Sequence, residues 1–278
     1  MAQIRGSAIP SRQILSDANT LSNQSRLWHG ELVDGQLKAA PLREAIFELY
    51  ADPEATTAWG ADSKGRTLSR LPSYAFNEEH LFDVGIRIEL GSGGTIQRQV
   101  PQERSRTWNE QGTKAVQFGS HMVALNILGP AYVQFEDHVD EMATVLRCYL
   151  EEARPSKIAW IGQRYINAIK VPVAETDVGS YFAIYPRLPA DYVGHRPFAL
   201  RLQTAATKNG AVMVSLSLEQ VDASDATYTL DIYARSTSDV PNDIDAIRAW
   251  QVTIHEAVRA AFEHSTSPRL RDHFAGSQ

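Results

Sequence analysis

The sequence predicts an α+β fold, mainly antiparallel sheet with two long helices packed on one side. Three observations predict it. Short segments that alternate apolar and polar residues dominate the chain, and Lys208-Asn209-Gly210 separates two of them with a pair that favours a tight hairpin turn. Only residues 132–153 and 241–264 keep the longer period of a helix over several turns. Strands in runs, each run followed by one helix, are typical of the α+β class.

Composition indicates an ordinary globular protein. The chain has 278 residues, of which 43% are hydrophobic and 22% charged, so it is long enough for a substantial core. Its net charge of −6 argues against a broad nucleic-acid-binding surface, although a local basic patch remains compatible with that average. The single cysteine, Cys148, excludes an internal disulfide and a multi-cysteine metal site, and we expect it to pack inside a helix.

The expected location is the cytoplasm. No apolar run reaches the roughly 18 residues that span a bilayer, and no signal-peptide pattern opens the chain. We therefore expect no membrane association.

The chain divides at Pro41. Residues 1–40 are rich in Ser, Gln and Asn and show no sustained period, so they are expected to form an N-terminal arm, either flexible or packed on the body or on another subunit. Residues 41–275 are expected to form one α+β domain. Its two halves, 41–172 and 180–275, have loosely similar layouts, which leaves a pseudo-repeat open.

In the first half, residues 42–50 fit a strand or a helix by period, and we favour the strand. Residues 52–72 are loop-like with room for one short helix. A hairpin is predicted at residues 84–100. Apolar and polar residues alternate over 84–90, glycines at 91–94 form the loop, and a second strand follows at 95–100. Two more strands fall within residues 115–128, and Gly129-Pro130 ends them because proline cannot continue a central ladder.

Residues 132–153 form the clearest helix, with one apolar stripe at spacings of three and four: Phe135, Val139, Met142, Leu146 and Tyr149. Pro155 ends it, and a long strand over 157–171 follows at once. In the second half, residues 181–185, 197–207, 211–221 and 226–236 read as strands. A last helix opens at Pro241 and Asn242 and runs to about His264, before a short tail at 268–274.

The strand over 157–171 carries large apolar groups on both faces, so both faces are expected to be covered. Arg164 lies on the face of Trp160 and Gly162, whereas Asn167 lies on the face of Tyr165. Burying such groups unpaired costs about 1–3 kcal/mol each, and more for a charge. Either Arg164 pairs with a carboxylate and Asn167 holds a neighbouring loop, or both line a pocket or a partner groove.

Complete catalytic sets are missing from the sequence. There is no Walker pattern, and the glycines at 91–94 sit in a hairpin. His255-Glu256 lacks the second histidine of a zinc-protease helix, so these side chains are expected to pack or to face water. The acidic run at 136–141 is typical of a solvated helix face. We therefore assign no catalytic residue, no metal ligand and no cofactor.

Polar residues recur on the polar faces of several predicted strands. Arginine clusters suit bidentate capture of phosphate or carboxylate. The layout is similar to that of a tunnel enzyme acting on triphosphates, but the E-x-E-x-K signature of its first strand is missing. A solvated sheet face crossed by ion pairs explains the same pattern. The candidate ligand-binding residues are Arg87, Arg164, Asn167, Arg201, Asp231 and Arg235.

Three segments resemble a known family. Residues 161–167, IGQRYIN, resemble the G-x-R-Y-I-N strand of a sporadically distributed, uncharacterised prokaryotic family suspected of belonging to mobile islands and anti-phage defence. Residues 41–48 are similar to its P-x-x-E-A-I-x-E start, and residues 255–263 to its H-E-x-x-x-x-A-F-E closing helix. Leu230-Asp231-Ile232 fits its L-D-I-D strand only in part, because Tyr233 replaces the second aspartate. The resemblance spans roughly residues 41–275 and implies a defence-linked or toxin–antitoxin-like accessory protein, without a substrate.

These observations lead to one main expectation of function. We expect a non-catalytic binding or sensing component that works with co-encoded protein partners, with self-association left open. The alternatives are a phosphate-ester hydrolase that would use Arg164, Arg201 and Asp231, or a nucleotide- or nucleic-acid-binding protein that uses the arginine-bearing sheet face. The acidic total weakens nucleic-acid binding without excluding it.

Overall fold

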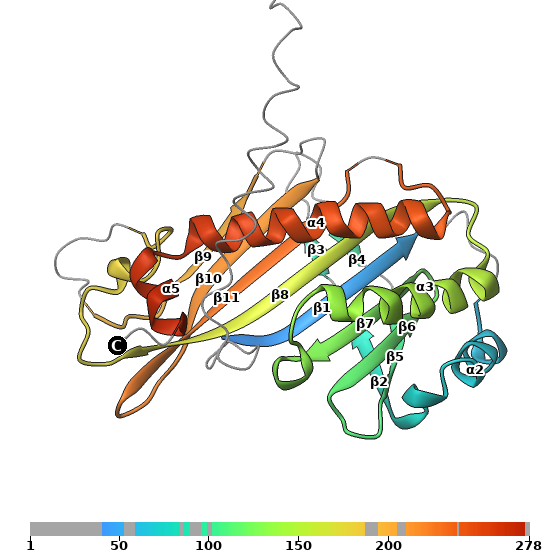
Figure 1. Cartoon of the computed structure of the whole chain (residues 1–278), viewed down its shortest axis with the longest axis horizontal. Coiled ribbons are helices and arrows are strands. Elements are labelled where there is room, and N and C mark those ends of the chain that lie inside the picture. Colours follow the sequence, from blue (N-terminus) through green and yellow to red (C-terminus); the bar gives the residue numbers. More distant parts are fainter. Residues whose placement is uncertain are drawn as a thin grey trace, which may run out of the picture.

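An antiparallel sheet organises the computed structural model, which describes residues 41–52, 59–83, 86–88, 96–98, 102–186, 194–204, 210–237 and 239–275. The predicted N-terminal arm at 1–40 lies outside these residues. The sheet order is β2-β5-β6-β7-β1-β8-β11-β10-β9, and all neighbours are antiparallel (Figure 1). Its strands are β1 (Leu42–Ala51), β2 (Phe76–Asp83), β5 (Gln102–Trp108), β6 (Lys114–Gly119), β7 (Met122–Leu128), β8 (Ile158–Pro172), β9 (Ala199–Gln203), β10 (Ala211–Val221) and β11 (Asp225–Arg235).

A separate two-stranded ribbon, β3 (Ile86–Ile88) and β4 (Ile96–Arg98), corresponds to the hairpin predicted at 84–100. The loop between them lies outside the described residues. The α+β class and the antiparallel sheet are thus confirmed.

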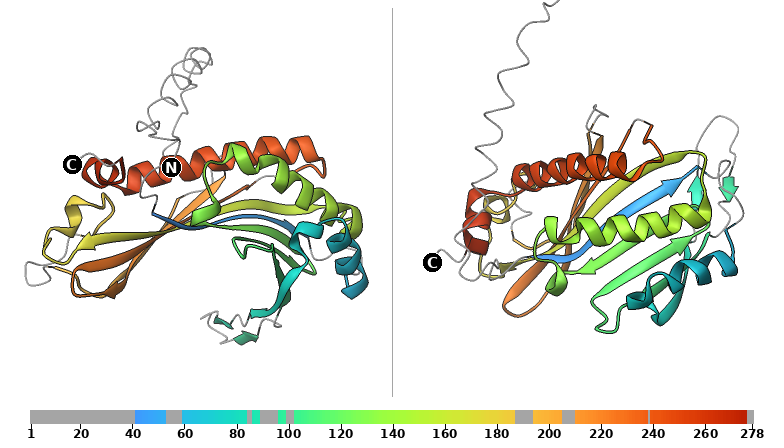
Figure 2. Two further views of the ribbon diagram at one scale, coloured as in Figure 1. Left: turned by 60° about the horizontal axis from the view of Figure 1, so that its bottom comes forward. Right: turned by 45° about the vertical axis from the view of Figure 1, so that its right-hand side comes forward.

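Two helices lie on the same face of the sheet, α3 (Val139–Ala153) and α4 (Ile244–Ser265) (Figures 1 and 2). Helix α4 begins after Asp243, whose side chain accepts hydrogen bonds from the backbone N–H groups of Asp245 and Ala246. Helix α3 ends at Ala153 and is capped by Arg154, which adopts a left-handed conformation with φ 43° just before Pro155. None of the helices in the described part of the chain is both long and apolar enough to pass through a membrane.

Smaller helical elements fill the connections. They are α2 (Ala61–Ser69), α5 (Pro268–Ala275) and the 3₁₀ turns η3 (Pro72–Tyr74), η4 (Gly129–Ala131), η5 (Glu136–His138) and η6 (Val178–Ser180). The prediction of a strand at 181–185 is wrong, because η6 leads into turns with one isolated bridge between Phe182 and Thr266. The predicted tail at 268–274 is helix α5, and the helix expected from Tyr132 begins as α3 only at Val139.

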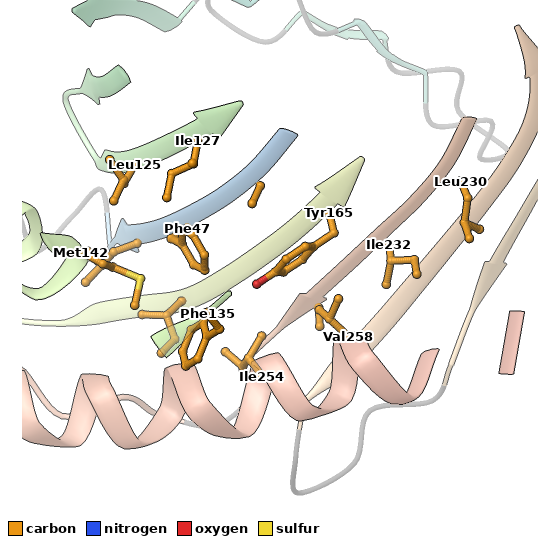
Figure 3. Packing of buried hydrophobic residues seen from close by; sticks show 14 of the residues in the cluster. Phe47, Leu125, Ile127, Phe135, Met142, Tyr165, Leu230, Ile232, Ile254 and Val258 are labelled. Carbon is orange, nitrogen blue, oxygen red and sulfur yellow. The ribbon is translucent and has the colours of Figure 1, made fainter. Parts of the chain in front are cut away.

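The core lies between the sheet and the two helices. Ala45, Phe47 and Leu49 of β1 point to the same side as Ile161, Tyr165 and Ile169 of β8, and all are buried. Phe135 and Met142 from the first helical region and Ile254 and Val258 from α4 pack onto this side (Figure 3). The apolar stripe predicted for residues 132–153 and the inner side of α4 therefore form the helix layer of the core.

The opposite face of the sheet carries no helix in the described structure. Toward β5 and β2 the sheet bends away from α3 and α4, so this helix-free face is concave there (Figure 2, left). Both faces of β8 were expected to be covered, but in the described part of the chain helices cover only one of them. Helices cover the face of Ile161 and Tyr165, whereas Trp160, Arg164 and Ile166 on the other face are only partly buried.

Candidate functional site

The helix-free face is built by strand register. Glu44, Ile46, Glu48 and Tyr50 of β1 share this face because they are two residues apart. Across the sheet, Glu48 lies opposite Gly162 of β8, and Gly162 lies opposite Arg235 of β11. The next row aligns Ile46, Arg164 and Tyr233, and the following row aligns Glu44, Ile166 and Asp231. The candidate face is this surface, extended through β10 to β9.

Arg164 forms a two-pronged ion pair with Asp231. Its Nε and Nη2 atoms donate to the two carboxylate oxygens at 2.9 Å and 2.7 Å. This confirms that Arg164 pairs with a carboxylate. The hydrogen bonds to Asp231 raise the pKa of the guanidinium further above its already high value. The side chain of Arg164 is 43% exposed and that of Asp231 15%, so the carboxylate is the more enclosed partner.

Glu48 is a buried carboxyl group on the same face. Burial raises its pKa above the usual value, although a hydrogen bond from Tyr233 and the charge of Arg164 act in the opposite direction. The contact depends on Gly162, because a Cβ atom there would lie 3.0 Å from both Glu48 Oε1 and the Tyr233 hydroxyl. Gly162 therefore leaves the space in which Glu48 and Tyr233 meet.

Aromatic rings hold Arg235. Trp160 stacks on Tyr50 with ring centroids 4.5 Å apart and planes 21° apart. The Arg235 guanidinium lies 5.3 Å from the centroid of the Trp160 ring, within the range of a cation–π interaction. This exposed cation is thus positioned by the protein's own rings.

On the part of the face nearest β5, polar side chains of the protein also contact one another. Asn126 of β7 donates to Glu44 at 2.7 Å, and its own side-chain carbonyl oxygen is buried with no hydrogen-bond partner among the described residues. Arg106 of β5 lies 4.0 Å from a carboxylate oxygen of Glu79 and 5.6 Å from the Trp108 ring centroid. Cations and carboxylates alternate along this face.

Four of the six predicted site residues share the helix-free face: Arg164, Asp231, Arg235 and Arg201. They are spread over β8, β11 and β9. Arg201 lies opposite Ser215 of β10, which lies opposite Asp231, so Arg201 and Asp231 are two strands apart. Two strand spacings are about 10 Å, and the Nε atom of Arg201 contacts the sulfur of Met213 on the intervening strand β10.

Asn167 does not belong to this group, and its position matches the alternation expected for this strand. Asn167 lies on the opposite, helix-covered face and is 5% exposed, because it is three residues from Arg164 and a strand alternates every residue. Its amide donates to the Leu230 carbonyl at 3.1 Å, across the strand pair and not to a loop. Arg87 belongs to β3, outside the nine-stranded sheet, and its side chain lies outside the described structure.

A second polar group lies on the helix side. The hydroxyls of Tyr132 and Tyr165 are 3.0 Å apart, and the Tyr165 hydroxyl lies 3.1 Å from His255 Nδ1. Phe135 stacks on the His255 ring with centroids 4.3 Å apart. Burial lowers the pKa of His255 to about 4. His255 therefore packs as a neutral ring, one of the two outcomes expected from the sequence.

Sequence reasoning placed Trp160 and Gly162 on the face of Arg164 but missed Glu48 and Tyr50 as members of it. A signal was present, since Glu44 and Glu48 alternate with the buried side of β1. Their meeting with β11 is a long-range pairing that no local pattern reveals. In the part of the chain that the structure describes, no group of three or more His, Cys, Asp or Glu side chains could hold a metal ion.

Comparisons with known proteins add little. No family model and no curated protein matches the chain. Among solved structures, an RNA triphosphatase of S. pombe, Pct1, is similar over 92% of this chain and 96% of that chain, with 9% sequence identity and a TM-score of 0.15. A TM-score this low carries no argument about fold or function.

Proposed function

We propose that this protein is a non-catalytic binding or sensing component that acts with a protein partner through the helix-free face. One observation carries the proposal. Arg164 is paired with Asp231, Arg235 stacks on Trp160, and the cations of the face are spread over several strands.

This arrangement suits a protein surface better than a phosphate. A phosphate that binds the Nε–Nη2 edge of Arg164 must displace Asp231, and Glu48 and Glu44 on the neighbouring β1 repel it. A protein partner presents both signs of charge and can match alternating cations and carboxylates one by one. The resemblance described above supplies the rest of the proposal, namely a partner encoded beside this chain in a prokaryotic defence or toxin–antitoxin-like system, in the cytoplasm.

We also infer that the two halves form a pseudo-repeat, each with one long helix on the same face of the sheet. The order β5-β6-β7-β1 in one half mirrors β9-β10-β11-β8 in the other, and the single helices α3 and α4 follow. The matching segments are 42–153 and 158–265, so β8 opens the second half. This differs from the boundary expected after residue 172.

Co-purification from the native host tests the proposed function. The full chain is tagged and the captured proteins are identified by mass spectrometry, with Arg235→Ala as the face variant. Arg147→Ala is the matched control, because Arg147 is exposed on α3. We expect a co-encoded protein with the wild type and the control, reduced at least about tenfold with Arg235→Ala.

Two outcomes would contradict the proposal. One is an identical set of proteins for both variants. The other is a nucleotide or nucleic acid that purifies with the wild type and is lost with Arg235→Ala, which would favour the nucleotide-binding alternative.

A further inference from the structure

The far edge of the sheet, β9, carries a second feature that the helix-free face does not explain. Within the nine-stranded sheet, β9 forms backbone hydrogen bonds on one side only, with its neighbour β10. Thr204 N–H donates to the Val212 carbonyl at 2.9 Å, and Leu218 N–H donates to the Phe198 carbonyl at 3.3 Å. Backbone groups alternate sides along an antiparallel strand, so Leu200 and Leu202 bond to β10. The N–H and C=O groups of Ala199, Arg201 and Gln203 therefore point away from the sheet.

Most side chains of β9 are also exposed, with Leu200 partly buried. Leu202 lies opposite the buried Val214, on the helix side, and is 44% exposed. Helix α4 packs on β8, β11 and β10, which leaves Leu202 at the margin of the apolar layer. On the helix-free side, Arg201 is exposed and contacts the Met213 sulfur; within the described residues it makes no ion pair with a carboxylate.

The opposite edge shows what a protected edge looks like. Strand β2 carries Glu78 and Glu79, which pair with Lys64 of α2 and with Arg106 of β5. Charged residues of this kind are the usual means by which sheets block addition of another strand. Strand β9 instead has one cation between two leucines.

We propose that β9 receives an extended segment of the protein partner as a tenth, antiparallel strand, with an acidic residue opposite Arg201 and apolar residues opposite Leu200 and Leu202. Backbone hydrogen bonds from Ala199, Arg201 and Gln203 supply the affinity, and the alternating side chains supply the specificity. This inference rests on the proposed function, because it names how that partner attaches.

A second copy of the chain fits this edge less well. The register that pairs all five residues of both strands, centred on Arg201, places two guanidinium groups directly opposite each other on one face. Like charges in that position are destabilising. An acidic residue in the same place forms a cross-strand ion pair.

Two labelled five-residue peptides with blocked ends test the proposal. The first is threonine-valine-glutamate-valine-threonine, and the second replaces glutamate with lysine. Fluorescence anisotropy with the full-length chain should show the glutamate peptide binding at least about tenfold more tightly than the lysine peptide. In Arg201→Glu the preference should reverse. Equal binding of the two peptides, or an unchanged preference in the variant, overturns the proposal.

Backbone pairing is tested at Gln203. Gln203→Pro removes an outward N–H without touching the bonds to β10, and Gln203→Ala is the matched control. Peptide affinity should fall at least about fivefold in the proline variant and stay unchanged in the alanine variant. Similar affinity in both variants would exclude strand addition.

Amide exchange and light scattering distinguish a partner segment at β9 from another part of the same chain and from a second copy of the chain. In the free chain the amides of Ala199, Arg201 and Gln203 should exchange freely and become protected with the glutamate peptide. Protection in a peptide-free monomer means that another part of the chain already covers the edge. A dimer that dissociates in Gln203→Pro means that a second copy does. Either result overturns the proposal, whereas loss of the native partner in Arg235→Ala would still support the proposed function.

Discussion

The Arg164–Asp231 pair predicts an asymmetric response to mutation. In Arg164→Met, the Asp231 carboxylate, only 15% exposed, loses both donors, at 2.9 Å and 2.7 Å. Stranding an enclosed charge is the larger penalty, and we expect a loss of about 2–3 kcal/mol in the free energy of unfolding. In Asp231→Asn, Arg164 keeps water contact because it is 43% exposed, so the loss should be about 1 kcal/mol.

The coupling free energy between Arg164 and Asp231 should be of the same size as the losses expected for the two single variants. Two charge-assisted bonds, discounted for the exposure of Arg164, correspond to about 1–2 kcal/mol. The double variant should therefore be less destabilised than the sum of the single variants by that amount.

Urea unfolding followed by circular dichroism measures all four proteins at pH 7. Equal m-values are needed so that the differences report stability alone. A coupling below about 0.5 kcal/mol, or a larger loss for Asp231→Asn than for Arg164→Met, would refute the assignment of Asp231 as the enclosed partner.

Three further predictions concern packing and pH. Gly162→Ala should lower the free energy of unfolding by about 1–2 kcal/mol, because the new Cβ atom would lie 3.0 Å from Glu48 Oε1. Gly65→Ala in α2 should raise the free energy of unfolding by about 0.5–1 kcal/mol, because a Cβ atom there has no other atom within 4 Å. Urea unfolding that ranks the two variants otherwise contradicts the packing described. Glu48→Gln should stabilise the protein at pH 7–8. The raised pKa of Glu48 means that its protonated form favours the fold, so the wild type loses stability as pH rises above 4.5. Unfolding titrations should show that the stability gained by Glu48→Gln vanishes below pH 4.5. His255 acts with the opposite sign. Its pKa of about 4, below the usual 6.5, means that the free energy of unfolding falls by at most about 3 kcal/mol as pH falls from 6.5 to 4. His255→Asn should flatten the dependence of stability on pH in that range, and an unchanged slope would show that His255 is not the titrating group.

Much of the fold could be predicted from the sequence because its signals are local. The alternation over 157–171 became β8, and the stripe from Val139 to Tyr149 became the buried side of α3. Strands β2 and β5 were missed, since FNEEHLFD and QERSRTW are polar at most positions and lack an apolar alternation. Their pairing depends on tertiary context that overrides propensity.

The candidate site could be predicted only in part. Alternation placed Arg164 and Asn167 on opposite faces of the same strand, yet both were counted as ligand-binding residues. The pairing of Arg164 with Asp231 spans 67 residues and depends on the register between β8 and β11. Arg201 could be identified as polar and strand-borne, but its place on an open edge follows from sheet order alone.

The order of the sheet also affects how the chain is made. β1 bonds to β7 on one side and to β8 on the other, so its second side stays open until residues 158–167 have left the ribosome. At about 5–20 residues per second, this delay lasts roughly 6–25 seconds. During that time the backbone N–H and C=O groups on that side of β1 lack their partners on β8. The nascent first half is therefore the stage at which a chaperone would bind most strongly.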